Sequence, residues 1–242
     1  MIARLKRREF ILLLGGAAAA WPLAARAQQP GKLPTIGFLG ANTRLVDSQR
    51  LAGFVERLRE LGWIENRTVA IEYRWGEGRN ERFAQFAAEF VRRNVDVIVT
   101  GGTASVIAVK QATSTIPIVF ATAGDPVGTG LVTSLAKPGG NVTGLSAQVP
   151  DLVGKRLELL REVVPGLRHL AILTNIGNPV IVLERDEIRT TAHTIGLEAI
   201  TMEIQRAEDI APAFEALKGG ADALYVPGDP LTRPTGRAAD EV

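Results

Sequence analysis

Short β-rich runs alternate with amphipathic helical stretches along the chain from residue 35 onward, and this alternation constrains the fold more than any other feature. The run Thr35–Leu39 is followed by apolar residues at helical spacing between Asp47 and Leu61, which end at Gly62. Val95–Thr100 is apolar apart from Asp96 and the terminal Thr100, as expected of a strand in a sheet covered on both faces. Repeated strand–helix units of this length predict an α/β fold with parallel sheets.

The other predicted elements continue the alternation. Strands are predicted at residues 69–73, 118–121, 141–145, 170–173, 197–204 and 223–226, and helices at residues 82–93, 104–111, 152–164, 180–195 and 210–217. The character of the sequence changes near residues 145–152, which predicts two Rossmann-like lobes: an N-terminal lobe over residues 28–148 and a C-terminal lobe over residues 149–230. Residues 231–242 are polar and lack a pattern, so we expect an irregular tail there.

The first 27 residues predict an export signal. A basic start at Lys6-Arg7-Arg8 precedes an apolar run from Ile11 to Ala20, and Ala25-Arg26-Ala27 fits a small-x-small cleavage site. The apolar run is about half of the roughly 20 residues that span a bilayer, which favours a cleaved signal peptide over a membrane helix. Arg7-Arg8 also fits a twin-arginine signal, with a plain Sec signal as the alternative. The mature protein is therefore expected to be periplasmic.

Composition excludes several classes of function. The whole chain has a formal charge of +2, but residues 1–27 hold five basic residues and one acidic residue, so the remainder carries about −2. This balance gives no support for nucleic-acid binding. The chain has no cysteine, which excludes disulfides, thiol catalysis and cysteine-ligated zinc. The roughly 215 remaining residues are enough to bury a hydrophobic core.

The sequence holds no recognisable catalytic or cofactor motif. It lacks a phosphate loop, a Gly-x-Gly-x-x-Gly fingerprint and a Gly-x-Ser-x-Gly elbow. Its two histidines, His169 and His193, are 24 residues apart and have no partner at metal-ligand spacing. We therefore expect no enzymatic activity, no cofactor and no metal.

Small and polar residues gather just after the predicted strands. In an open parallel sheet, ligands bind outside the carboxyl ends of the strands, so these segments are the expected binding site. The candidate ligand-binding residues are Asn42, Thr43, Gly101, Gly102, Thr103, Asp125, Asn175 and Asp229. The same residue types serve in ordinary turns and helix caps, so both interpretations remain open at each position.

Two kinds of candidate differ in the chemistry they offer. Gly101–Ser105 fits an anion cradle, because small residues let the backbone approach a ligand and free N–H groups at a helix start can hold a carboxylate. Asp125 and Asp229 each lie in a Gly-Asp-Pro tripeptide after a strand. Either carboxylate could meet a ligand ammonium group, or it could cap a turn while the proline fixes the backbone.

Several motifs, in this order, resemble one family: Arg7-Arg8-Glu9-Phe10-Ile11, Ala24-Ala25-Arg26-Ala27-Gln28, Ile36-Gly37-Phe38-Leu39, Glu72-Tyr73-Arg74-Trp75, Ile116-Pro117-Ile118-Val119-Phe120, Gly124-Asp125-Pro126-Val127-Gly128, Pro138-Gly139-Gly140-Asn141-Val142-Thr143-Gly144, Lys155-Arg156-Leu157-Glu158-Leu159-Leu160 and Leu224-Tyr225-Val226-Pro227. The sequence resembles the ABC-transporter substrate-binding proteins of the tryptophan/tyrosine-binding type, which have a type I periplasmic-binding-protein fold. The resemblance implies a receptor that closes around a small amino-acid-like ligand and delivers it to an ABC permease in the inner membrane. It implies that Gly101–Thr103 hold the ligand carboxylate and that Asp125 and Asp229 are candidates for its amine. We expect such a receptor to be a monomer.

The resemblance also implies a larger second lobe than the one predicted. Three strands are predicted there where about five are expected, a difference of roughly 60–80 residues at about 30 per strand–helix unit. We therefore expect an incomplete second lobe, and a truncated, non-functional receptor is one alternative. An exported hydrolase and the effector half of a sugar-responsive repressor are the others. The hydrolase would need a nucleophile beside a base, and the repressor a helix-turn-helix that the sequence lacks.

Overall fold

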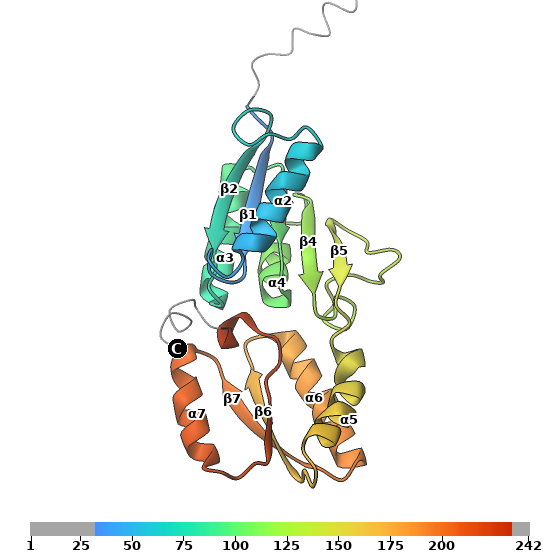
Figure 1. Cartoon of the computed structure of the whole chain (residues 1–242). Coiled ribbons are helices and arrows are strands. Elements are labelled where there is room, and N and C mark those ends of the chain that lie inside the picture. The colour runs from blue at the N-terminus through green and yellow to red at the C-terminus, as the bar shows by residue number, and fades with distance from the viewer. Residues whose placement is uncertain (1–31, 234–242) are drawn as a thin grey trace, which may run out of the picture. The chain divides into compact units, whose positions relative to one another are not determined.

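Two parallel β-sheets, each flanked by helices, organise the computed structural model, which describes residues 32–233 (Figure 1). The predicted export signal and residues 234–242 of the predicted tail lie outside the described residues. Residues 34–233 belong to one compact unit. Among residues 32–233, no helix combines the length and apolarity needed to cross a membrane.

The first sheet has five parallel strands in the order β2-β1-β3-β4-β5. Its strands are β1 (Thr35–Gly40), β2 (Ala70–Trp75), β3 (Val97–Thr100), β4 (Ile118–Ala123) and β5 (Val142–Ser146). The connecting helices are α2 (Ser48–Glu60), α3 (Asn80–Arg93) and α4 (Thr103–Ala112). Figure 1 shows α2 in front of this sheet and α3 and α4 behind it.

The two faces of the first sheet are covered unequally. The face under α3 and α4 holds the main core, where Phe83 and Phe90 of α3 pack with Leu39, Ile98 and Phe120. On the other face, no residue of α2 is fully buried. The contact there is aromatic, with the Phe38 ring centroid 5.6 Å from those of Phe54 and Trp75 and 5.9 Å from that of Tyr73.

The second sheet has three parallel strands in the order β7-β6-β8. These strands are β6 (His169–Asn175), β7 (Glu198–Ile204) and β8 (Ala223–Tyr225), and the helices are α5 (Val153–Val163), α6 (Pro179–Thr194) and α7 (Ile210–Leu217). Three short 3-10 turns complete the described elements: η1 (Pro150–Leu152), η2 (Ala207–Asp209) and η3 (Pro230–Thr232).

The central strand β6 separates two apolar clusters. Leu170 and Ile172 face α5 and α6 and pack with Leu157 and Ile188. Ala171 and Leu173 face the opposite way and pack with apolar residues of α7. Every residue of β6 after His169 is buried, as expected of a strand covered on both faces.

The predicted α/β class with parallel sheets is confirmed, and the second sheet holds three strands where the first holds five. The structure differs from the sequence-based expectation at the start of the predicted tail. There, Leu231 lies in η3 and packs against the α7 side of the second sheet. The Asp229 side chain accepts a hydrogen bond from Leu231 N at 2.8 Å, which holds this turn in place.

Candidate functional site

The candidate residues fall into two groups, one at the carboxyl ends of the strands of each sheet. Asn42 and Thr43 follow β1, Gly101–Thr103 follow β3, and Asp125 follows β4. Asn175 ends β6, and Asp229 lies four residues beyond β8. Because all strands within each sheet are parallel, the residues of each group lie at one edge of their sheet.

The loop between β3 and α4 is held by its own hydrogen bonds. Gly102 has a φ of +89°, which favours glycine, and its N–H donates to Thr122 O at 2.9 Å. The buried Thr103 accepts from Gly124 N through its hydroxyl at 3.1 Å. The Ser105 hydroxyl lies 2.6 Å from Gly101 O and 2.8 Å from Gly102 O.

This loop leaves the start of α4 open. Gly102 is the residue before the helix, and no side chain accepts a hydrogen bond from the first turn. The first N–H groups of an α-helix have no partner within the helix, and the helix dipole favours negative charge there. Residues 103–105 can therefore donate backbone hydrogen bonds to a carboxylate.

Asn42 and Thr43 lie in the turn that follows β1. Asn42 Nδ2 donates to Asp47 Oδ1 at 2.8 Å, and Val46 N donates to Thr43 Oγ1 at 3.4 Å. Asn42 Oδ1 is buried and accepts no hydrogen bond from the described residues. A Cβ on Gly102 would lie 3.4 Å from Ala41 Cβ, so the turn after β1 adjoins the loop after β3.

Asp125 caps the turn that follows β4. Its Oδ1 accepts from Gly128 N at 2.8 Å, and its carbonyl oxygen accepts from the Thr129 hydroxyl at 2.5 Å. The side chain is half-buried. One carboxylate oxygen of Asp125, Oδ1, therefore caps the turn. The other, Oδ2, has no hydrogen-bond partner among the described residues.

Asn175 and Asp229, which are 54 residues apart, meet in a buried polar cluster. Asp229 is 2% exposed, and its Oδ1 accepts from Asn175 Nδ2 at 3.0 Å. Its Oδ2 accepts from Asn178 Nδ2 at 2.7 Å. Both carboxylate oxygens of Asp229 thus accept hydrogen bonds from side chains of the protein, and these hydrogen bonds hold the loops together.

Asn178 is a member of this cluster that the sequence analysis did not select. It is 4% exposed and precedes α6, whose first residue is Pro179. The sequence signal that could have identified Asn178 is an asparagine followed by a proline, a pair that is common at the start of a helix. Asn178 Oδ1 is buried and has no hydrogen-bond partner among residues 32–233.

Two contacts connect the loops of the first sheet with those of the second. Asn80 Nδ2, at the start of α3, donates to Gly177 O at 2.8 Å. A Cβ on Gly124 would lie 2.5 Å from Val180 Cγ2, so only glycine allows this approach. Among the described residues, no hydrogen bond joins the candidates of one sheet directly to those of the other.

Tyr225 belongs to an ionic cluster around the buried carboxylate of Glu184. Its hydroxyl donates to Glu184 Oε1 at 2.7 Å, and Arg156 Nη1 lies 2.8 Å from that same carboxylate oxygen. Glu184 is fully buried, and this burial raises the pKa of its carboxyl group. Burial, with the hydrogen bond to Glu184, raises the pKa of Tyr225 to about 12. The cluster joins α5, α6 and β8, and sequence spacing gave no sign of it.

The histidines lie away from the candidate site. His169 begins β6, at the end of the strand opposite to Asn175, and its ring approaches Asp222 and Glu198. His193 lies in the last turn of α6. Within residues 32–233, no group of three or more histidine, aspartate and glutamate side chains could hold a metal ion. The site thus offers backbone N–H groups at the start of α4, amide and hydroxyl side chains, and the carboxylate of Asp125, which together can bind a small polar molecule.

Comparison with known proteins identifies the family of the chain. The sequence model of the family described as "ABC transporter substrate binding protein" matches residues 46–233. The chain is 30% identical over 179 residues to the tyrosine-binding protein of Clostridioides difficile (strain R20291), covering 74% of this chain and 51% of that protein. The chain therefore spans about half the length of this curated relative.

Solved structures share the fold. An ABC domain from Streptococcus pneumonia in complex with L-Trp has a TM-score of 0.74 and 26% identity, with coverage of 83% of this chain and 67% of that one. The leucine-binding protein LivK of Thermotoga maritima has a TM-score of 0.59 and 14% identity, covering 80% of this chain and 56% of that one, and it supports the fold alone. The fold is that of a type I periplasmic binding protein, and the chain belongs to the family of ABC transporter substrate-binding proteins.

Proposed function

We propose that this protein is the extracytoplasmic solute-binding component of an ABC importer and binds an amino-acid-like molecule between its two lobes. The observation that carries the proposal is the uncapped start of α4, where the backbone N–H groups of residues 103–105 follow the loop Gly101–Gly102. The names of two relatives, one that binds tyrosine and one solved with L-Trp, support an aromatic amino acid as the ligand.

Each end of the ligand has a proposed partner. The carboxylate accepts hydrogen bonds from the backbone of residues 103–105, where the charge also complements the helix dipole. The ammonium group lies near Asp125 Oδ2 and Asn42 Oδ1, two acceptors that no described residue uses. Asn175 and Asp229 shape the facing loop through their mutual hydrogen bond.

The proposal includes the route and the partner of the protein. Residues 1–27 direct export to the periplasm, by the twin-arginine or the Sec pathway, and the loaded receptor docks on an ABC permease in the inner membrane. The family consists of binding proteins, and both histidines lie away from the strand ends that carry the candidate residues. A receptor with binding but no turnover is the function that this site supports best.

The first test is calorimetry and thermal denaturation of the purified protein with tryptophan and tyrosine. A ligand at 100 times its Kd should add about 2.7 kcal/mol to the free energy of unfolding. Tryptamine, which lacks the carboxylate, and indole-3-propionate, which lacks the amine, serve as matched ligand controls. We expect both to bind at least about 10-fold more weakly, since each loses a charged hydrogen bond. Tryptamine binding as tightly as tryptophan would contradict the carboxylate cradle.

A pair of glycine variants separates the cradle from general stability. Gly102→Ala and Gly130→Ala both force a side chain into positive φ, at +89° and +69°, so both should destabilise the protein by about 1–2 kcal/mol. Only the Cβ at residue 102 would lie beside the start of α4, where the ligand carboxylate is proposed to bind. A Cβ at residue 130 would meet nothing within 4 Å. We expect only Gly102→Ala to weaken amino-acid binding. Equal losses of affinity in both variants would argue against the proposed site.

A further inference from the structure

The two lobes touch along the sheet edges that carry the candidate residues. Asn80 Nδ2 of the first lobe donates to Gly177 O of the second at 2.8 Å. A Cβ on Gly124 would lie 2.5 Å from Val180 Cγ2, so the backbone of the first lobe lies directly against the start of α6. The lobes are therefore closed against each other in this structure.

Residues 147–149 link β5 of the first lobe to η1 and α5 of the second (Figure 1). The linker is hydrogen-bonded to the first lobe at both of its ends. Ala147 N donates to Ala123 O at 2.8 Å, and Val149 N donates to Gly124 O at 2.9 Å. These two bonds attach the linker to the end of β4.

The second lobe holds the chain just beyond this linker. Arg156 of α5 lies 2.8 Å from Glu184 of α6, and Leu157 of α5 is buried in the core of the second lobe. Helix α5 should therefore move together with the second lobe. Any change of backbone angles on separation of the lobes then falls on residues 148–152, and among these Gln148 alone has a positive φ.

Gln148 lies between the two linker hydrogen bonds and has a φ of +44°. Left-handed backbone brings the Cβ of such a residue close to the following carbonyl oxygen, which is why glycine is usual in this conformation. The Gln148 side chain is exposed, and its contact with Asp151 Oδ2 is long, at 3.3 Å. The backbone bonds on either side, rather than packing of this side chain, therefore hold Gln148 in its strained conformation.

Gly124 connects the linker to the proposed ligand site. Its N–H donates to Thr103 Oγ1 at 3.1 Å, at the start of α4, while its carbonyl oxygen accepts from Val149. The start of α4, the linker and the second lobe thus meet at one residue. A ligand bound at α4 acts on the same set of contacts that holds Gln148.

We propose that Gln148 is a strained hinge residue, whose left-handed conformation belongs to the closed arrangement and relaxes when the lobes separate. Strain of this kind disfavours closure in the empty protein and assists release of the ligand. The inference rests on the proposed function in one respect: contacts of a ligand with both lobes are what offset the strain. A residue that adopts positive φ easily should shift the empty protein toward the closed arrangement.

Substitutions at residue 148 that differ in their tolerance of positive φ test the hinge. Glycine adopts it freely, asparagine more readily than glutamine, and β-branched valine with the greatest difficulty. The closed share of the ligand-free protein should therefore fall in the order Gln148→Gly, Gln148→Asn, unchanged protein, Gln148→Val. Asparagine also separates relief of strain from the added backbone freedom of glycine.

Double electron–electron resonance measures the closed share as a distribution of distances between two spin labels, one on each lobe. The labels are attached at Gln85→Cys of α3 and Glu215→Cys of α7, two exposed positions in a chain without other cysteines. We expect a population of shorter distances that grows in the order given and that also grows when tryptophan or tyrosine is added to the unchanged protein.

Two further variants serve as controls. Lys218 is exposed and has a φ of +34° at the end of α7, away from the linker. Lys218→Gly should stabilise the fold as Gln148→Gly does, but leave the distances unchanged. Gln148→Ala removes the contact with Asp151 and keeps the strain, so it should not increase the closed share.

Calorimetry with tryptophan and tyrosine gives a second readout, because apparent affinity scales with the share of the binding-competent state. We expect Gln148→Gly to bind about 2–5-fold more tightly, Gln148→Val to bind more weakly, and Lys218→Gly to match the unchanged protein.

Identical distances in all the variants overturn the hinge, as does an equal effect of Gln148→Gly and Lys218→Gly. Because the distances are measured without ligand, this failure is distinct from failure of the proposed function. The proposed function fails if tryptophan and tyrosine neither bind nor shift the distances of the unchanged protein. An ordered shift among the residue 148 variants would still support the hinge in that case.

Discussion

At the residue scale, Asp125 and Asp229 show how the same tripeptide serves two environments. Both carboxylates lie in Gly-Asp-Pro sequences after strands. Asp125 is half-buried and caps its own turn, whereas Asp229 is 2% exposed and binds the amides of Asn175 and Asn178. The carboxylate of Asp229 is therefore a structural acceptor for two buried donors.

Asp229→Ala should destabilise the protein by about 2–4 kcal/mol, because it leaves two buried amide donors unpaired. Asp125→Ala loses only one turn hydrogen bond and should cost about 0.5–1.5 kcal/mol. Urea denaturation without ligand measures both. If Asp229→Ala left stability unchanged but abolished amino-acid binding, Asp229 would be a ligand residue after all, as the family resemblance implies.

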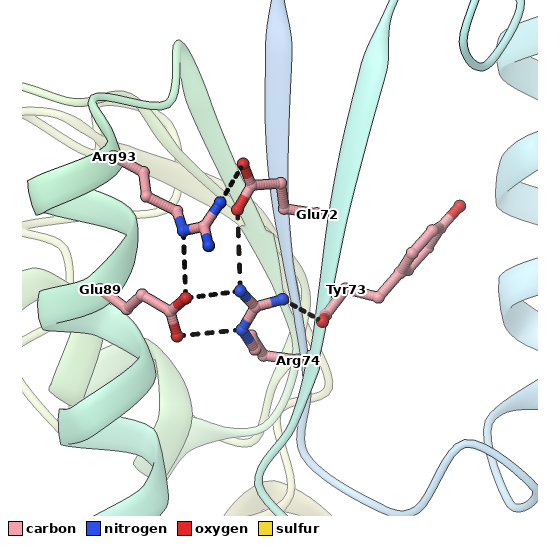
Figure 2. A network of polar contacts seen from close by, with 5 residues as sticks. All are labelled: Glu72, Tyr73, Arg74, Glu89 and Arg93. Atoms are coloured by element: carbon pink, nitrogen blue, oxygen red, sulfur yellow. Dashed lines mark hydrogen bonds and ion pairs between the residues drawn. The ribbon is translucent and has the colours of Figure 1, made fainter.

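At the scale of elements, the charged cluster in Figure 2 attaches α3 to strand β2. The hydrogen bonds from Arg74 are the largest influence on Glu89, and they lower the pKa of its carboxyl group to about 2. The folded pKa thus lies below the ordinary value of 4.5. An acid with a depressed folded pKa stabilises the protein above its unfolded pKa, and this stability is lost as the pH falls toward the folded value.

Glu89→Gln should therefore lower stability at pH 7, by about 1–2 kcal/mol given that both side chains are partly exposed to solvent. The difference from the unchanged protein should shrink as the pH falls from about 4.5 toward about 2. Chemical denaturation across this pH range checks the prediction, with Glu81→Gln, an exposed residue of the same helix, as the control. A difference that stayed constant with pH would rule out the ionic contribution of Glu89.

At the scale of the whole molecule, Asn80 links the loops of the two sheets by its hydrogen bond to Gly177 O. Gly177 also donates to Asn175 Oδ1 at 2.9 Å, so the link reaches the buried cluster of Asn175, Asn178 and Asp229. A ligand that contacts both sheets favours the same arrangement that this bond favours.

Asn80→Ala should therefore weaken amino-acid binding by about 2–10-fold, which corresponds to the net loss of one hydrogen bond. Because Asn80 is exposed, the free energy of unfolding without ligand should change little. Calorimetry measures the affinity, and Glu81→Ala at the next position of α3 is the control. Unchanged affinity in Asn80→Ala would mean that the link has no part in binding.

The sequence alone predicted the elements and the fold class. Helix α3 was predicted from the helical spacing of Phe83, Ala87 and Phe90. Strands β3 and β6 were predicted from apolar runs, which are typical of strands covered on both faces. Spacing and apolar runs are local properties of the sequence, so they can be recognised without knowing which elements pack together. The placement of candidate residues at strand ends followed from the same parallel topology.

Only the tertiary structure decided what the individual polar residues do. The carboxylate of Asp229 accepts hydrogen bonds from the side-chain amides of Asn175 and Asn178, which are more than 50 residues away in the sequence. Glu184 is buried because Arg156 and Tyr225 reach it from two other elements. Such roles come from contacts between distant segments, whereas the alternation of strands and helices is set by the short-range pattern of apolar residues.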